Sequence, residues 1–164
     1  MDHPDLVRRL QILESLINKA NGATAGDLEL QAHWAKYLCV IVAGFLEAAL
    51  REVYTTFTVK SASPQVAAFA TSTLSSIQNP KAQRFIETAR AFKSEWGEDL
   101  ERFLEGGSGK DAIDSIMANR HLIAHGGDSG ITMARLKQLL GACLPVVEFI
   151  EDQCAGRSHH RRNP

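Results

Sequence analysis

Apolar residues recur along this chain at intervals of three and four, the spacing that places side chains on one face of an α-helix. The pattern begins at Leu6 and stops at Asn21-Gly22, which predicts a first helix that ends there. A longer second helix is predicted from about residue 27 to residue 57. Its core-facing stripe consists of Leu38, Val42, Phe45, Ala49 and Val53.

The next two predicted helices are separated by local stop and start signals. Ser63-Pro64 starts a shorter helix, because proline is tolerated in the first helical turn. Asn79-Pro80 ends it. The apolar residues of 81–104 then predict one further helix, bent at Gly97.

Two more helices complete the pattern, one that begins near Asp111 and a last one with Thr132 as its expected N-cap. Pro145 predicts a kink in the last helix. Because no run of alternating β-branched residues indicates a strand, we expect an all-α, up-and-down helical bundle of four to five main helices. Residues 1–154 are predicted to form a single helical domain, and 155–164 a tail.

Composition agrees with one globular domain. The chain has 164 residues, within the ~100–200 of a typical domain, and 45% of them are hydrophobic. The formal net charge of −1 provides no overall attraction to nucleic acid, so any site for a polyanion must be local.

Three features predict a cytoplasmic protein with no membrane segment. The polar N-terminus "MDHPDLVRRL" lacks the apolar core of a signal peptide. The most apolar run, residues 37–46, is far shorter than the ~20 residues that span a membrane. The three cysteines form no CxxC pair, which predicts free thiols in a reducing compartment.

Basic residues gather at the C-terminal end of the chain. They are Arg157, His159, His160, Arg161 and Arg162. A solvated, disordered tail is favoured over an arm that binds nucleic acid.

A glycine-rich loop at residues 105–111 contains Gly109-Lys110, as a phosphate-binding P-loop does. A P-loop also needs a glycine five positions before Gly109, where this chain has Leu104. It needs Ser or Thr after the lysine, where this chain has Asp111. We therefore exclude a P-loop.

The stretch "MANRHLIAHGGDSG", residues 117–130, places Arg120, His121 and His125 at a helix end that Gly126-Gly127 terminates. The simplest interpretation is structural, because histidines interact favourably with the exposed carbonyls of a last helical turn. Gly126 is well placed as the left-handed residue that ends the helix.

Two chemical interpretations are open beside the structural one. His121 and His125 are four residues apart and share a helix face, so they could bind one zinc ion, although no third ligand is evident. Alternatively, imidazole can transfer protons near neutral pH, and arginine binds phosphate through its planar fork, as RNA cleavage without metal requires. Arg120 and His125 lie roughly 140° apart around a regular helix, so only an irregular helix end would let them flank one groove.

The stretch "NRHLIAHG" resembles the signature of the HEPN superfamily, whose nuclease members carry Arg, four to six residues and then His. Residues 40–54, "VIVAGFLEAALREVY", look like the family's long helix, with an acidic residue at Glu47. The segments "IQNPKAQRFIETARAFKSEWGEDLERFL", "DAIDSIMANRHLIAHG" and "ITMARLKQLL" are similar to the RiboL-PSP-associated branch. The resemblance covers roughly residues 30–150.

The resemblance implies a HEPN-like bundle that dimerises and builds a composite cleft. It implies a metal-independent endoribonuclease without a cofactor, acting on RNA in a toxin–antitoxin, phage-defence or RNA-stress system, with an antitoxin or operon partner protein. Arg120 and His125 take the catalytic positions, and Glu47, Asn119 and His121 are supporting residues. Glu47 either orients one of the catalytic pair or forms a buried or interface salt bridge, and the two alternatives are about equally favoured. The alternative is a non-catalytic HEPN module that binds a nucleotide or a partner protein.

Overall fold

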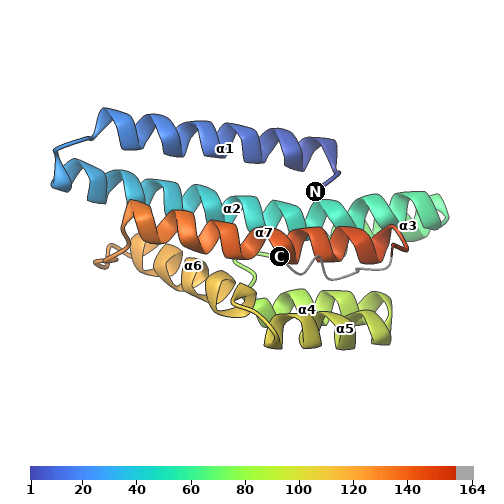
Figure 1. Ribbon diagram of the computed structural model, residues 1–164. Helices are drawn as coiled ribbons and strands as arrows, with labels where there is room; N and C mark the ends of the chain where they lie inside the picture. The colour runs from blue at the N-terminus through green and yellow to red at the C-terminus, as the bar shows by residue number, and fades with distance from the viewer. Residues whose placement is uncertain (158–164) are drawn as a thin grey trace.

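The computed structural model describes residues 1–157, which form seven α-helices and no strand (Figure 1). In chain order they are α1 (Pro4–Ala23), α2 (Leu28–Ser61), α3 (Pro64–Ser75), α4 (Ala82–Phe92), α5 (Ser94–Glu105), α6 (Gly109–Ala124) and α7 (Met133–Cys154). The all-α class is confirmed, with seven helices in place of the four to five main ones expected.

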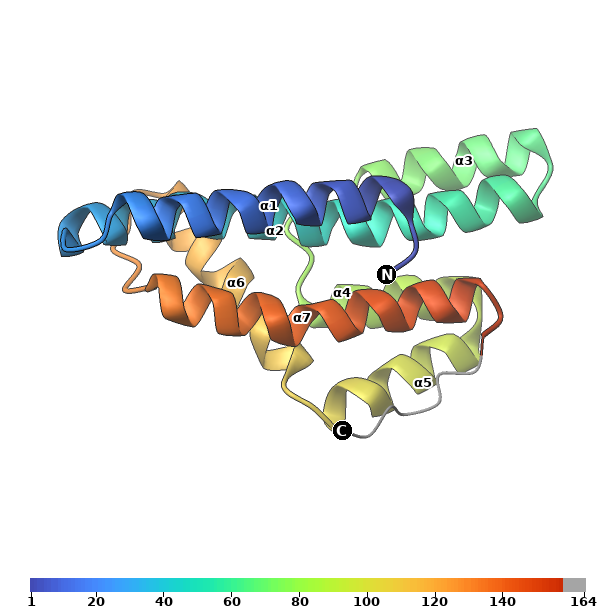
Figure 2. The same cartoon turned by 45° about the horizontal axis from the view of Figure 1, so that its top comes forward.

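The long helix α2 is the centre of the bundle. It packs against α1, α3, α6 and α7, and Figure 2 shows α1 and α7 running along much of its length. The predicted core stripe is confirmed, because all five of its residues are buried. They fill the space between α2 and its neighbours, which is the main source of stability in a bundle of this kind.

Side chains that cap helices fix two of the predicted starts. The Asp27 carboxylate accepts a hydrogen bond from Leu30 N at 2.9 Å, one residue before α2 begins. Thr132 Oγ1 accepts from Arg135 N at 3.2 Å in front of α7, as predicted. Each bond satisfies one of the backbone donors that a helix leaves free in its first turn.

The single bent helix predicted over residues 81–104 is wrong. The chain breaks at Lys93, whose extended backbone (φ −157°, ψ 130°) separates α4 from α5. The two helices then pack side by side (Figure 1). Gly97 makes this packing possible, because a Cβ atom there would lie only 2.5 Å from Arg90 Cβ.

Helix α7 ends at Cys154, where the domain was predicted to end. Arg157, assigned to the tail, is held by ion pairs of 2.7 Å to Asp2 and Asp152. The other basic residues of the predicted tail lie outside the described residues. Within residues 1–157, no helix combines the length and the apolar character that a membrane span requires.

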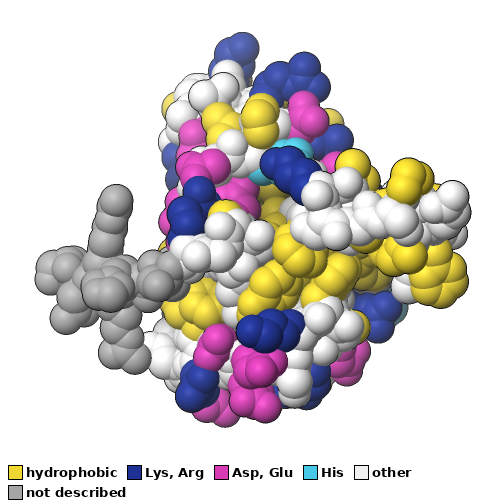
Figure 3. Space-filling model, turned by 90° about the vertical axis from the view of Figure 1, so that its right-hand side faces the viewer, with side chains coloured by type: hydrophobic (Ala, Val, Ile, Leu, Met, Phe, Trp, Pro, Cys, Tyr) yellow, Lys and Arg dark blue, Asp and Glu magenta, His cyan; other side chains and the backbone are white. Residues whose placement is uncertain are grey.

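Two surfaces of the bundle expose large apolar side chains. Helix α3 packs mainly on α2, and the hairpin they form leaves Val59, Val66 and Phe69 exposed at one end of the molecule. Figure 3 views the molecule from that side, and hydrophobic side chains cover a large part of the face. The second surface is on the N-terminal half of α2, where Leu30 and Tyr37 are exposed.

Candidate active site

The stretch with the arginine and two histidines ends α6 in a Schellman motif. Gly126 adopts a left-handed conformation with φ 72°, as expected for the residue that ends the helix. Gly127 N donates to Leu122 O at 2.8 Å, and Gly126 N donates to Ile123 O at 3.2 Å. These bonds satisfy carbonyls of the last turn and fix His125 as the C-cap of α6.

The loop after His125 is attached to two helices by side-chain bonds. Ser129 Oγ donates to Asn119 Oδ1 at 2.7 Å, and Asn119 Nδ2 donates to the Ser115 carbonyl at 2.8 Å. Lys36 on α2 donates to Asp128 Oδ1, also at 2.8 Å. This hydrogen bond and the positive charge of Lys36 lower the pKa of the Asp128 carboxyl. Asn119, predicted as a supporting residue, therefore holds the loop against the helix that carries His125.

His121 and His125 lie against each other, as their spacing of four residues predicts. Their ring centroids are 4.4 Å apart with the planes tilted by 56°, and both residues are exposed. A zinc site takes three or four protein ligands. In the part of the chain that the structure describes, no group of three His, Cys, Asp or Glu side chains is placed to hold a metal ion.

Arg120 points to a different side of α6 from the histidine pair. The helix is regular up to Ala124, so Arg120 and His125 lie about 140° apart around its axis. Arg120 is half-buried, and its guanidinium makes no hydrogen bond or ion pair with any of residues 1–157. One chain thus presents an unpaired cation and two imidazoles at the same helix end, without bringing Arg120 and His125 into contact.

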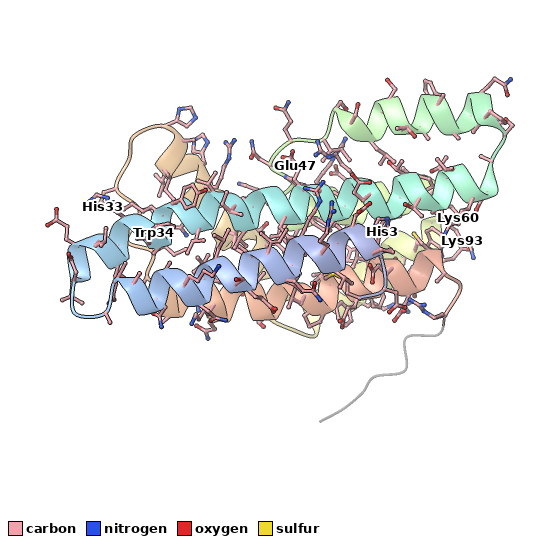
Figure 4. All side chains as sticks on the ribbon, turned by 90° about the horizontal axis from the view of Figure 1, so that it is seen from above. His3, His33, Trp34, Glu47, Lys60 and Lys93 are labelled. Atoms are coloured by element: carbon pink, nitrogen blue, oxygen red, sulfur yellow. The ribbon has the colours of Figure 1, made fainter. Side chains whose placement is uncertain are left out.

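Glu47 makes no hydrogen bond or ion pair with the other predicted site residues among residues 1–157. Figure 4 shows it further along α2 than His33 and Trp34. Its carboxylate accepts from Asn79 N at 2.8 Å and pairs with Arg51 at 3.3 Å. Within one chain, Glu47 therefore holds the turn before α4, and it does not orient Arg120 or His125.

Residues on α2 complete the surroundings of the motif, and sequence inspection did not identify them. Lys36 gave no signal, because only the fold brings it to Asp128, 92 positions further along the chain. Near it, Leu30, His33, Trp34 and Tyr37 line a hollow of about 280 Å³. These four residues are three or four positions apart, which places them on one helix face, so the sequence could have indicated that they lie together.

The cysteines belong to the core and not to the site. All three are free thiols, as predicted. Burial raises the pKa of Cys39 to about 11 and those of Cys143 and Cys154 to about 12. They therefore stay protonated near neutral pH and are unsuited to act as nucleophiles.

The fold and the motif together define an all-helical domain that carries an Arg-x4-His motif at a helix end. The sequence profile of the RiboL-PSP-HEPN family matches residues 4–156, and the chain belongs to this family of the HEPN superfamily. The match spans all seven helices, so the family assignment covers the whole bundle. No curated protein and no solved structure matches the chain.

Proposed function

We propose that this protein is a metal-independent endoribonuclease that acts as a homodimer. The observation that carries the proposal is the joint placement, at one helix end, of the exposed His121–His125 pair and of the Arg120 guanidinium, which has no partner among residues 1–157. A guanidinium without a protein partner is free to bind a phosphate, and its planar fork suits two phosphate oxygens. Membership of the HEPN superfamily supports the same assignment.

The proposed reaction is a transfer within the RNA backbone. A base removes the proton of the 2′-hydroxyl, and the 2′-oxygen attacks the adjacent phosphorus. The bond from phosphorus to the 5′-oxygen breaks, and an acid protonates that oxygen, which leaves a 2′,3′-cyclic phosphate and a 5′-hydroxyl. Arg120 stabilises the charge on the phosphate, and His125 transfers a proton as base or acid.

A dimer accounts for what one chain lacks. The reaction needs a base, an acid and positive charge around one phosphate, and Arg120 and His125 of a single chain point to different sides of α6. Two copies of this helix end offer two arginines and two His125 side chains, so one copy's Arg120 can act with the other copy's His125. We further propose a cytoplasmic role in a toxin–antitoxin, phage-defence or RNA-stress system, with an antitoxin as a partner.

The test is incubation of the purified protein with total RNA and with tRNA in EDTA. We expect cleavage that leaves 2′,3′-cyclic phosphate ends and is lost in an Arg120→Ala variant. Arg8→Ala is the matched control, because it removes an arginine that is 75% exposed on α1, on another helix. Cleavage that stops in EDTA and returns with zinc contradicts the proposal. An intact protein without any cleavage indicates a binding module.

A further inference from the structure

A hollow on α2 presents aromatic side chains to solvent near the loop that follows His125. It is lined by Leu30, His33, Trp34 and Tyr37, which stand three or four positions apart on one helix face, and its volume is about 280 Å³. This is close to the lower limit of ~300 Å³ for pockets that hold small molecules. The hollow therefore has room for one planar ring system.

Two aromatic rings of the hollow meet at a right angle. The ring centroids of Trp34 and Tyr37 are 5.6 Å apart, and the ring planes are inclined by 87°. A planar group that stacks on the face of one ring therefore lies at a right angle to the other ring. Stacked and edge-to-face arrangements are both favourable for aromatic groups, so this corner can hold a flat ligand and also orient it.

The same two rings carry hydrogen-bonding atoms that the described part of the chain does not use. Neither Trp34 Nε1 nor the Tyr37 hydroxyl has a hydrogen-bond partner among residues 1–157. Tyr37 is exposed, and Trp34 is partly buried against the core, which holds its ring in place. A ligand that matches these rings has a flat aromatic face and polar edges, and an unpaired nucleobase has both.

The hollow lies beside the loop that joins the candidate catalytic residues to α2. Lys36 Nζ on α2 donates to Asp128 Oδ1 at 2.8 Å, and Asp128 follows His125 by three residues. His33 of the hollow is three residues before Lys36, so the two share one flank of α2. Figure 4 shows the loop reaching α2 near His33. An RNA strand with a phosphate at the Arg120 end of α6 can therefore extend along this flank to the hollow.

We propose that the corner formed by Trp34 and Tyr37 stacks one unpaired base of the RNA, close to the phosphate that is cleaved. This inference rests on the proposed ribonuclease function and adds a substrate-binding subsite to it. A base inside a duplex has both faces covered by its neighbours, so the subsite selects single-stranded segments and loops. Because every base has an aromatic face, stacking alone selects weakly among the four bases.

Binding of a short RNA that cannot be cleaved tests the subsite apart from catalysis. Oligo-adenosine with 2′-O-methyl groups lacks the attacking hydroxyl, and tripolyphosphate supplies negative charge without a base. Trp96 is the other of the two tryptophans and packs against Phe57, so Trp96→Phe leaves Trp34 as the fluorescent reporter. We expect the oligonucleotide to quench the fluorescence of Trp34 and tripolyphosphate to leave it unchanged. Equal quenching by both probes, or none by the oligonucleotide, overturns the inference.

Two substitutions of Tyr37 separate stacking from apolar contact. Tyr37→Leu keeps an apolar side chain but removes the ring, and should weaken binding of the oligonucleotide about 5–100-fold. Tyr37→Phe keeps the ring and should lose much less. Since Tyr37 is 53% exposed, both variants should melt close to the wild type. Phe69→Leu is the matched control, because it removes a ring that is 75% exposed on α3, and it should bind as the wild type does. Equal losses for Tyr37→Leu and Phe69→Leu overturn the inference.

Two further measurements distinguish failure of this inference from failure of the proposed function. Sedimentation at the concentration of the binding assay should give Tyr37→Leu the mass of the wild type, whereas a changed mass indicates that the hollow contacts protein and overturns the inference. With cleavable RNA, Tyr37→Leu should raise KM more than it lowers kcat, because stacking binds substrate and transition state alike. If the wild type cleaves RNA and Tyr37→Leu keeps its KM, only this inference fails. If the oligonucleotide quenches Trp34 but the wild type cleaves no RNA, only the proposed function fails.

Discussion

Replacing Ser129 with alanine removes the hydroxyl that donates to Asn119 Oδ1 at 2.7 Å and holds the loop after His125. A hydrogen bond of this kind contributes about 0.5–1.5 kcal/mol to folding. Asn119 is only half-buried, so water can reach the acceptor that the mutation leaves. We therefore expect Ser129→Ala to lower the free energy of unfolding by about 1 kcal/mol.

Asn119→Ala should cost more than Ser129→Ala. It leaves the Ser129 hydroxyl, in a residue only 2% exposed, without its acceptor. An unsatisfied buried donor costs about 1–3 kcal/mol. The double variant should show a coupling energy of about 1 kcal/mol, because both single changes remove the same bond.

Urea denaturation of the wild type, the two single variants and the double variant measures these terms. For a chain of this length, about 1 kcal/mol also corresponds to a fall of about 2–4 °C in Tm. Ser75→Ala is the matched control, since the Ser75 hydroxyl binds a backbone carbonyl at 2.7 Å in an exposed position. If Ser129→Ala is no less stable than Ser75→Ala, or the two single effects simply add, the loop is not held in this way.

Four further outcomes are expected. His125→Ala should reduce the cleavage rate roughly 10²–10⁴-fold with little change in Tm, and His121→Ala should reduce the rate less. If rate assays show a larger loss for His121→Ala than for His125→Ala, His125 has a structural role. Arg120→Lys should also lose cleavage, since an ammonium lacks the planar fork. Gly109→Ala should lower the free energy of unfolding, measured in urea, by about 1–3 kcal/mol. The added Cβ atom would lie only 2.5 Å from a methyl group of Val146, which is buried on α7. The hydrogen bond from Lys36 holds the pKa of the Asp128 carboxyl below its ordinary value of 3.8. The Lys36–Asp128 pair therefore stabilises the fold above pH 3.8, and this contribution is lost as the pH falls through the lowered pKa. In an acid titration, the free energy of unfolding of Asp128→Asn should fall less than that of the wild type.

Most helix ends were predictable from the sequence because their causes are local. Thr132 is predictable as an N-cap and Gly126 as the left-handed residue that ends a helix, and the structure confirms both. The N-cap at Asp27 was not predicted. The break at Lys93 was missed because the periodicity of the apolar residues continues through it. Only the packing of α5 against α4 decides that the chain turns there, and Gly97 serves that contact.

The sequence by itself determined the all-α class, the buried stripe of α2 and the adjacency of His121 and His125. These follow from helical periodicity, which fixes which side chains share a face. The tertiary structure alone decided what surrounds the motif. It brought Lys36 to Asp128, assigned Glu47 to Asn79 and Arg51, and left Leu30 and Tyr37 of α2 exposed. Such contacts join residues far apart in the chain, so they depend on how the helices pack and not on the period within any one helix.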